Sequence, residues 1–534
     1  MNAPKFYRDN RESCDFDRAL SLTGYGRFHY ETTAACCLSI LVVGFQNGLS
    51  AYIFPPARCE LNLSSYELGF LNVAFLGGST ISCFIWGFLA DNQGRRKILI
   101  FTHLINALIT VLCSLSPYKN VLIVCRLSSG FLIGAPGSLV YTYIAEFHPP
   151  KLRFTSVCLC GMFFVAAWLL LPIIAYFILP LDIKYNFRNI FAITPWRVFL
   201  LILAIPDLLV GLWFIRLPES PKYYMARGYP KKALAVLQKM YSANYGKCRE
   251  FFPVKNIISE VNSGIKNNEV VITGKTARVL KEILQQIKRL FRAPLLVKTT
   301  LTTGIMFCNM FGLFGLGLWL PEIFIKFQRY ETLHPNTTIT LKDLSSLPLI
   351  TNQTCQPSFD QSVIINTVST GLTALIFNGI CCWVATKVSS KNMTLVLSVI
   401  GGISAGSIYW LRSATQNLIV ACIFQSTIMT ANLSITSIVV ELFPTSVGGI
   451  AVCLVICVGR TGAAISNIVF AYSMDKKCEL PIFVVAVFEI LAGVLCLMVP
   501  KEKKPLNNED DNNTETYKKN NYEITTLSNK IADN

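Results

Sequence analysis

The sequence predicts an all-α integral membrane protein whose twelve transmembrane helices form two six-helix halves. Hydrophobic residues make up 52% of the 534-residue chain, charged residues 15%, and the mean hydropathy is +0.48. A soluble chain would carry about 25% charged residues. Twelve apolar segments reach the length of about 20 residues that spans a bilayer core. Lys and Arg gather in the short segments between them, as in proteins with a positive cytoplasmic face.

The apolar segments divide the chain at its centre. Six spans are expected within residues 33–216 and six within 297–499, on either side of a polar loop at 217–296. An arm of residues 1–32 precedes them, and a polar tail at 500–534 has a composition that predicts disorder. The expected spans are 33–54, 68–90, 97–116, 121–143, 156–179, 196–216, 297–320, 361–385, 393–411, 415–438, 447–471 and 480–499.

The loop charges predict the topology. Twelve spans place both termini on one side, together with the basic arm, the loop at 94–97, the loop at 217–296 and the KEKK run at 501–504. This basic side should be cytoplasmic. The arm is basic ahead of any apolar run, so we expect the first span to be an uncleaved signal anchor. Plasma membrane and intracellular vesicle membrane fit the same charges.

Two polar loops carry further expectations. The loop at 327–360 should be extracellular or luminal and holds two glycosylation sequons, at Asn336 and Asn352. In the central loop, residues 277–291 have an apolar face opposite lysine and arginine side chains. Such a helix could lie on membrane lipid or pack on the bundle, and both alternatives stay open.

Cysteine and histidine usage excludes several classes of site. Most of the 19 cysteines lie in apolar runs, where they act as small hydrophobic residues, and with four histidines no metal site is expected. A disulfide between two of Cys59, Cys355 and Cys478, in loops of the non-cytoplasmic side, remains open. No nucleophile–base pattern indicates an enzyme, and no cofactor is expected. The basic loop has few interleaved aromatic residues, so we expect no nucleic-acid partner.

The stretch GFLADNQGRR at residues 87–96 places charges directly after an apolar run. Gly87 would let its helix approach a neighbour closely, and Gly94 would permit a tight turn. Asp91 can accept hydrogen bonds from helix N-terminal amides or pair with a basic residue. Arg95 and Arg96 can reach acids and lipid phosphates.

This stretch resembles the G-x-x-x-D-x-x-G-R-R loop between spans 2 and 3 of the major facilitator superfamily. Three further segments resemble signatures of that superfamily: CRLSSGFLIGAPGSLVYTYIAEFHPPKLR in span 4, LPESPKYYMARG after span 6, and VVELFPTSVGG between spans 10 and 11. The resemblance covers about residues 20–500. It implies the twelve-helix fold and a conformational latch of the outward-open state. The latch residues implied are Gly87, Asp91, Gly94, Arg95, Arg96, Arg126, Glu146, Arg153 and Glu441.

Within the superfamily, the chain resembles the synaptic vesicle glycoprotein 2-like branch. The segments FDRALSLTGYGRFHY, WRVFLLILAIPDLL and FGLFGLGLWLPEIF carry this resemblance. The vertebrate vesicle proteins have a large luminal domain between spans 7 and 8, whereas this chain has a short loop there. An animal form of invertebrate type is therefore expected, and partners of the luminal domain are not implied.

The second half departs from the superfamily pattern. Thr386 stands where the repeated motif would carry its acid, Ser389 where it would carry glycine, and Gly448 where an arginine follows ELFPTS. We therefore expect Glu146 to pair with nearby Arg153, whereas Glu441 must find another partner. The second latch should be weaker than the first.

A substrate cavity is expected near the bilayer midplane, between the halves. Arg460 lies where organic-ion carriers of the superfamily place an arginine facing the cavity, which predicts a site for an organic anion. Structural pairing of Arg460 is the alternative. The expected cavity residues are Gln46, Asn47, Asn309, Trp319, Gln425, Asn432, Arg460 and Asn467. Any of these polar side chains could instead only link helices.

Other ionisable residues lie in the spans. Span 1 lacks the acid of the vertebrate vesicle proteins, so proton coupling through that position is not expected. Asp207 and Glu489 lie on spans that are peripheral in this fold, and we expect pairing or lipid-headgroup contact rather than a proton relay. We expect His103 to be a hydrogen-bonded histidine at a helix interface.

These observations predict a monomeric transporter that carries a small organic solute, most simply an organic ion, by alternating access. Membrane lipid and the solute are its expected partners. The competing interpretation is a non-transporting vesicle scaffold or receptor of the same fold. The missing span-1 acid and the degraded second latch both favour that alternative.

Overall fold

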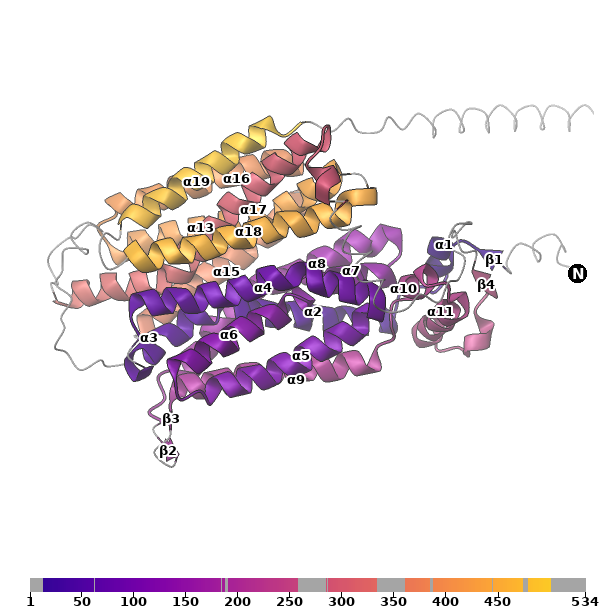
Figure 1. The fold of residues 1–534 in the computed structure, drawn as a ribbon, viewed down its shortest axis with the longest axis horizontal. Coiled ribbons are helices and arrows are strands. Elements are labelled where there is room, and N and C mark those ends of the chain that lie inside the picture. Colours follow the sequence, from indigo (N-terminus) through magenta and orange to yellow (C-terminus); the bar gives the residue numbers. More distant parts are fainter. Residues whose placement is uncertain are drawn as a thin grey trace, which may run out of the picture. The chain divides into compact units, whose positions relative to one another are not determined.

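A computed structural model describes residues 13–61, 63–183, 185–187, 191–257, 285, 287–333, 361–384, 388–443, 445–473 and 479–500. Within them, eleven helices are long and apolar enough to cross a membrane. A twelfth span is α4, if its two segments, bent by 43°, count as one. The predicted all-α membrane fold is thereby confirmed (Figure 1).

The N-terminal half begins earlier than the apolar run indicated, because α2 starts at Arg27 and α3 continues it. Gly94 ends α4, and a proline opens α7, α8 and α9, where its missing N–H costs no helical hydrogen bond. The helices of this half are α2 (Arg27–Gly48), α3 (Ser50–Leu61), α4 (Ser65–Gln93), α5 (Arg95–Ser114), α6 (Lys119–Ile133), α7 (Pro136–Phe147), α8 (Pro150–Ile178) and α9 (Pro195–Arg216).

The C-terminal half differs from expectation in one helix. The seventh span is much longer than predicted, since α13 continues beyond the apolar run to Leu333 and contains Pro321. The helices here are α13 (Leu295–Leu333), α15 (Gln361–Val384), α16 (Ser390–Ser407), α17 (Ala414–Leu442), α18 (Thr445–Ser473) and α19 (Glu479–Met498), with a short 3-10 turn, η4 (Ile408–Trp410), between α16 and α17.

Small elements gather at one end of the bundle, which we call the latch end because the turn between α4 and α5 lies there (Figure 1). Asn244 ties them to the bundle by accepting a hydrogen bond from Phe28 N at 3.0 Å. The hairpin of β2 (Tyr185–Phe187) and β3 (Phe191–Ile193) lies at the opposite end. The latch-end elements are β1 (Ser13–Cys14), α1 (Phe16–Ser21), α10 (Pro221–Ala226), α11 (Pro230–Tyr245), η3 (Arg249–Phe251) and β4 (Asn256–Ile257), and β1 pairs in parallel with β4.

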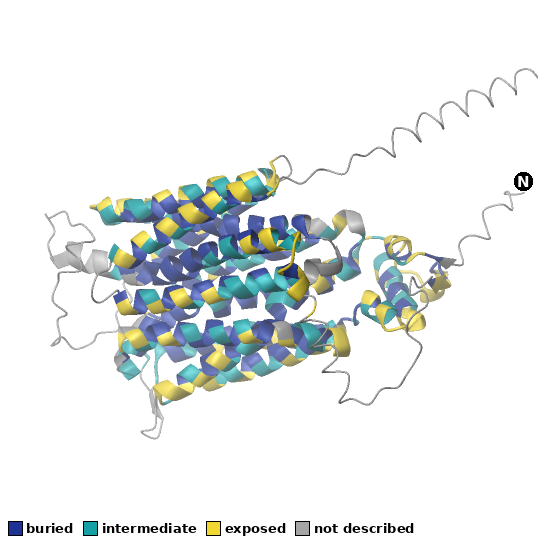
Figure 2. Ribbon diagram, turned by 45° about the horizontal axis from the view of Figure 1, so that its top comes forward, coloured by how far each residue is buried: buried dark blue, intermediate teal, exposed yellow. Residues whose placement is uncertain are grey.

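The two halves pack along two helix pairs, α4 with α18 and α8 with α15. Buried residues follow the inner faces of the helices, whereas exposed residues alternate with them on the outer helices (Figure 2). Many of those exposed side chains are large and apolar, such as Ile205, Val487 and Leu497. An apolar exterior is what a hydrocarbon solvent allows.

Several predictions fall on parts of the chain that are not described. The sequons at Asn336 and Asn352, the cysteines at 355 and 478, and the tail from 501 onward lie outside the described residues. So do the side chains of Cys59 and Glu441 and most of the helix predicted at 277–291.

Candidate functional site

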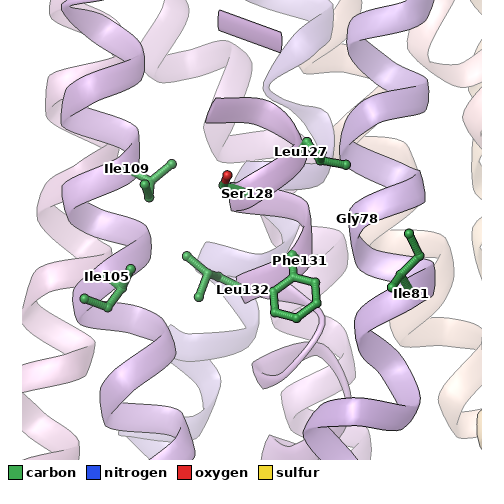
Figure 3. A pocket seen from close by; sticks show the side chains of 8 residues that line it. All are labelled: Gly78, Ile81, Ile105, Ile109, Leu127, Ser128, Phe131 and Leu132. Carbon is green, nitrogen blue, oxygen red and sulfur yellow. The ribbon is translucent and has the colours of Figure 1, made fainter. Parts of the chain in front are cut away.

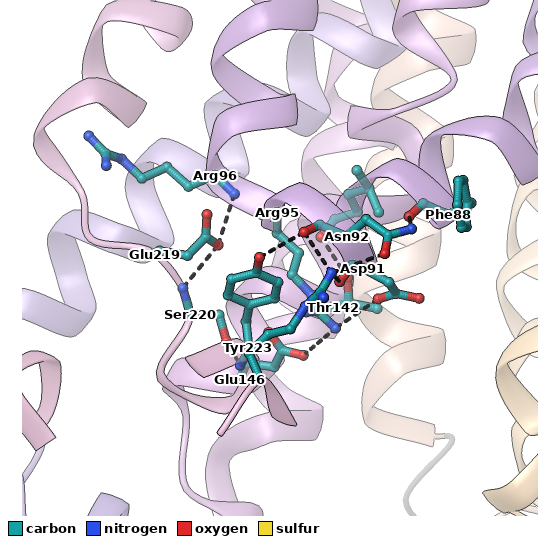
Figure 4. A network of polar contacts seen from close by, with 12 residues as sticks. Phe88, Asp91, Asn92, Arg95, Arg96, Thr142, Glu146, Glu219, Ser220 and Tyr223 are labelled. Carbon is teal, nitrogen blue, oxygen red and sulfur yellow. Dashed lines mark hydrogen bonds and ion pairs between the residues drawn. The ribbon is translucent and has the colours of Figure 1, made fainter. Parts of the chain in front are cut away.

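The latch end holds a polar cluster built around the turn between α4 and α5 (Figure 4). Gly94 forms this turn with a φ of 102°, a conformation that favours glycine. The turn places Arg95 at the start of α5, where its guanidinium lies 3.2 Å from Asp91 and 3.2 Å from Glu146 of α7. Arg95 thus joins two acids from different helices. The Asp91 side chain is 74% exposed, whereas that of Glu146 is 12% exposed, so the second pair is the better shielded.

Glu219, which follows α9, holds the start of α5 from the other side. Its Oε1 accepts hydrogen bonds from the backbone N–H groups of Arg96 and Ser220, both at 3.1 Å. The Arg96 side chain donates to the carbonyls of Phe214 at 3.0 Å and Ile215 at 2.5 Å. The first turn of α5 and the last turn of α9 are therefore bonded to each other. Glu219 lies in the LPES segment, whose sequence did not indicate this contact with α5.

Helix α10 covers the turn. The Tyr223 hydroxyl donates to the Asn92 carbonyl at 3.0 Å, and Arg227 donates to the carbonyls of Asp91 at 2.9 Å and Asn92 at 2.6 Å. Arg95 lies 5.6 Å from the centre of the Tyr223 ring, within range of a cation–π contact. The central loop at 217–296 thus contributes Tyr223 and Arg227 to this cluster. The motifs before span 3 and in span 4 did not indicate this contribution.

Three predicted latch residues lie differently from expectation. Arg153 does not pair with Glu146; it donates to the Ala145 carbonyl at 3.0 Å and lies 3.5 Å from Asp17. No atom of the described residues lies within 4 Å of the position that a Cβ on Gly87 would take, so no described helix approaches closely there. Arg126 is buried within the bundle, away from the cluster. The side chain of Glu441 lies outside the described residues.

A second polar group at the same end surrounds two histidines. His148 is buried between the ends of α7 and α8, with Nδ1 2.8 Å from the Ile144 carbonyl and Nε2 3.4 Å from the Thr33 hydroxyl. Burial lowers the pKa of His148, because desolvation disfavours the imidazolium form. The centre of its ring lies 5.1 Å from that of His29.

A buried polar network joins α2, α5, α6 and α9 inside the N-terminal half. His103 Nδ1 lies 2.7 Å from Asp207 Oδ1, and both side chains are fully buried. Asn106 donates to Asp207 Oδ2 at 2.5 Å, and the other ring nitrogen of His103 lies 2.7 Å from the Ser39 hydroxyl. His103 is therefore a hydrogen-bonded interface histidine, as predicted. Asp207 is therefore paired, which is one of the two arrangements predicted for it; the other was contact with lipid headgroups.

Gln46 connects this pair to Arg126. Its amide nitrogen donates to Thr110 at 3.1 Å and Asp207 at 3.5 Å, and its carbonyl oxygen accepts from Arg126 at 3.3 Å. Arg126 also donates to the Ser50 hydroxyl at 3.0 Å. Gln46 thus bridges the Arg126 guanidinium and the Asp207 carboxyl group within one half. The structure places its side chain in this network and not among the residues that line a pocket between the halves.

The halves meet through polar contacts of α18. Asn467 accepts a hydrogen bond from Asn72 of α4 at 2.8 Å and another from Trp319 of α13 at 3.3 Å. Arg460, partly buried, donates to the Ser79 carbonyl at 2.7 Å. Of the predicted cavity residues, Asn467, Trp319 and Arg460 therefore lie at or beside the contact between the halves. The Asn72–Asn467 contact is near the end of the bundle opposite the latch.

A small pocket of about 20 Å³ lies between the halves. It is lined by Ala51, Tyr52 and Trp168 of the first half and by residues of α13, α15 and α17, including Thr370 and Gln425. The buried Gln425 carbonyl oxygen has no hydrogen-bond partner among the described residues. This pocket brings aromatic side chains and polar groups together between the halves.

The remaining predicted cavity residues bond within their surroundings. Asn47 and Asn432 each donate to a carbonyl one turn earlier in their own helix. Asn309 accepts a hydrogen bond from Ser398 at 3.3 Å.

A larger pocket, of about 370 Å³, lies against the outer faces of α4, α5 and α6 (Figure 3). Its lining is apolar except for Ser128, and Ile81 is 63% exposed there, so it suits an acyl chain better than a polar solute.

Comparison with known proteins agrees with this architecture. The chain is 24% identical over 336 residues to human synaptic vesicle glycoprotein 2B, which covers 59% of this chain and 48% of that protein. It spans about half the length of the vesicle glycoproteins it matches. It is also 24% identical to the putative transporter svop-1 of Caenorhabditis elegans over 504 residues, covering 93% of this chain and 87% of that one. The predicted resemblance to the vesicle glycoprotein branch is confirmed.

The fold also matches solved structures. The xylose transporter XylE from E. coli, in a partially occluded inward-open conformation, superposes with a TM-score of 0.63 at 18% identity. The match covers 90% of this chain and all of that one. The family model for "Sugar (and other) transporter" matches residues 27–313. This chain is therefore a member of the sugar (and other) transporter family, within the major facilitator superfamily.

Proposed function

We propose that this protein carries a small organic solute across a membrane by alternating access between its two halves. The observation that carries the proposal is the interface itself. The two halves meet at polar contacts of α18 and enclose a pocket lined from both sides. Such contacts can break and reform as the halves rock about a site between them.

An organic anion is the first candidate solute, because Arg460 brings a guanidinium to the interface. Among the described residues, its guanidinium donates one hydrogen bond, to the Ser79 carbonyl. The other N–H donors of the guanidinium could bind a carboxylate or sulfonate. A sugar is the second candidate. The family match and the Trp168, Tyr52, Thr370 and Gln425 lining favour it, since aromatic faces and neutral polar groups suit a polyhydroxyl solute.

The proposal extends to topology and partners. We propose that the latch end faces the cytoplasm, because Arg95, Arg96 and Arg227 lie there beside the lysines of α11. The membrane is that of the cell surface or of a vesicle, and the working unit is a monomer in contact with membrane lipid.

The test is solute flux into proteoliposomes containing the full chain. Organic anions, organic cations, sugars and neutral solutes are offered separately to wild type, Arg460→Ala and the control Arg412→Ala, which removes an exposed arginine between α16 and α17. Saturable uptake of an anion that fails only in Arg460→Ala would support the anion site. Saturable sugar uptake in all three proteins would reject the anion and keep transport.

The scaffold alternative is tested by Asp91→Asn. Asp91 is mostly exposed, so the change should leave the thermal stability of the protein unaltered. A transporter whose gating uses the Asp91–Arg95 pair should lose turnover. If folded wild-type protein transports none of the solutes, the result would favour a scaffold or receptor.

A further inference from the structure

The two halves carry acids at equivalent positions in their last helices. Asp207 in α9 and Glu489 in α19 each lie the same number of residues before a proline, Pro218 and Pro500, that follows the end of the helix. Asp207 receives hydrogen bonds from its neighbours, as described above. Both carboxylate oxygens of Glu489, by contrast, have no hydrogen-bond partner among the described residues.

The surroundings of Glu489 are apolar or neutral. The side chain is fully buried and lies against Gly312 of α13, where an added Cβ would collide with Glu489 Oε1. Asn309, one turn earlier on α13, has a buried amide nitrogen without a partner in the described residues. The Cys308 thiol is the titratable group that faces Glu489 from α13. In the described parts of α16, α17 and α18, no titratable or charged group has an electrostatic interaction with the Glu489 carboxyl group.

An ionised carboxylate in such a place would be very unfavourable. Moving an isolated carboxylate from water into a medium of low dielectric costs far more free energy than the fold can offset, so the group takes up a proton instead. Among the described residues, no group of three or more His, Cys, Asp or Glu side chains is placed so that it could hold a metal ion. Buried ionisable residues within membrane spans usually serve a function.

We propose that Glu489 is a proton-binding site, and that its proton is taken up on one side of the membrane and released on the other as solute is carried. Glu489 is buried and has no hydrogen-bond partner among the described residues, which differs from our expectation that it would be paired or would contact lipid headgroups. The proposal rests on the transport function proposed above and names its coupling ion. Proton coupling would then use an acid in span 12, because span 1 contains none.

Helix α13 links this site to the pocket between the halves. Gly312 contacts Glu489, and the same helix supplies Gly317, Leu320 and Pro321 to the pocket lining. A movement of α13 that opens the pocket must therefore change the packing around Glu489. Access of water to the carboxylate would then favour loss of the proton, and closure of α13 would favour its return.

Proton binding can be measured without any solute. Infrared spectra of the purified full-length protein in lipid, at neutral pH, report the carbonyl stretch of protonated carboxylic acids. We expect such a band in wild type and in the control Glu479→Gln, which makes the same change at the first turn of α19, and its loss in Glu489→Gln. Glu489→Gln should stay folded, since glutamine resembles a protonated glutamate. Identical bands in all three proteins would overturn the proton site.

Flux measurements test the coupling. A pH gradient should drive accumulation of the solute by wild type and by Glu479→Gln. Glu489→Gln should lose this accumulation and its pH dependence, yet still exchange solute across the membrane without a gradient. Gradient-driven accumulation that persists in Glu489→Gln would overturn the coupling. If wild type moves no solute, the proposed function and the coupling fail together, while the infrared band still decides whether Glu489 holds a proton.

Discussion

At the scale of the residue, the Asp207 carboxylate accepts hydrogen bonds from its neighbours. These bonds determine how much free energy of unfolding is lost when Asp207 is substituted. Its Asn variant would present an amide NH₂ to donors of His103 or Asn106, leaving a buried donor unsatisfied. Asp207→Asn should therefore lower the free energy of unfolding by about 1–3 kcal/mol. Glu489→Gln, the same chemical change at the equivalent position, should lower the free energy of unfolding little, because the carboxylate has no hydrogen-bond partner among the described residues to lose. Thermal unfolding of both variants in detergent checks this, and an equal loss of stability would contradict the account.

The same scale shows what the sequence can and cannot predict. The motif residues Asp91, Gly94 and Arg95 do form one cluster, because they are adjacent on one turn. Nearness in sequence misled the assignment for Glu146, whose partner is Arg95 and not Arg153. Asp207 and His103 are too far apart in the chain for any spacing to reveal their pair, which only the packing of α5 on α9 creates.

At the scale of the element, the turn between α4 and α5 should be the least tolerant part of the latch. Alanine at Gly94 meets two obstacles, a positive φ of 102° and the Glu219 side chain. We expect Gly94→Ala to destabilise the protein by about 1–3 kcal/mol from backbone strain alone, and to displace Glu219 from the start of α5. Gly228→Ala is the comparison, because Gly228 also has a positive φ, 74°, and no atom of the described residues lies within 4 Å of its Cβ position.

Melting temperatures of the two variants measure the two losses. We expect the larger loss in Gly94→Ala, because its backbone conformation, with φ 102° and ψ 147°, and the contact with Glu219 both oppose an added Cβ. Equal losses would mean that the cluster around Glu219 adds nothing to stability.

The helices themselves were largely predictable, since long apolar runs in a bilayer must be helical. Their ends were not, because α13 and α2 extend into polar sequence that hydropathy does not mark.

At the scale of the whole molecule, the halves touch through Asn72 and Asn467 near the end opposite the latch. The latch cluster is formed in the same structure, although the superfamily resemblance assigns the latch to the outward-open state. Its described members belong to the N-terminal half and the central segment, so the Arg95–Glu146 pair can persist while the opposite end is closed. The contact between α4 and α18 is therefore the better reporter of which end is open.

The central claim, that the halves must separate at this contact to carry solute, is tested by a reversible cross-link. Asn72→Cys and Asn467→Cys are combined, joined by a bifunctional methanethiosulfonate, and assayed for solute flux in proteoliposomes beside wild type treated with the same reagent. We predict that flux stops in the cross-linked double variant and returns on reduction, while treated wild type is unaffected. Undiminished flux through fully cross-linked protein would contradict alternating access at this interface.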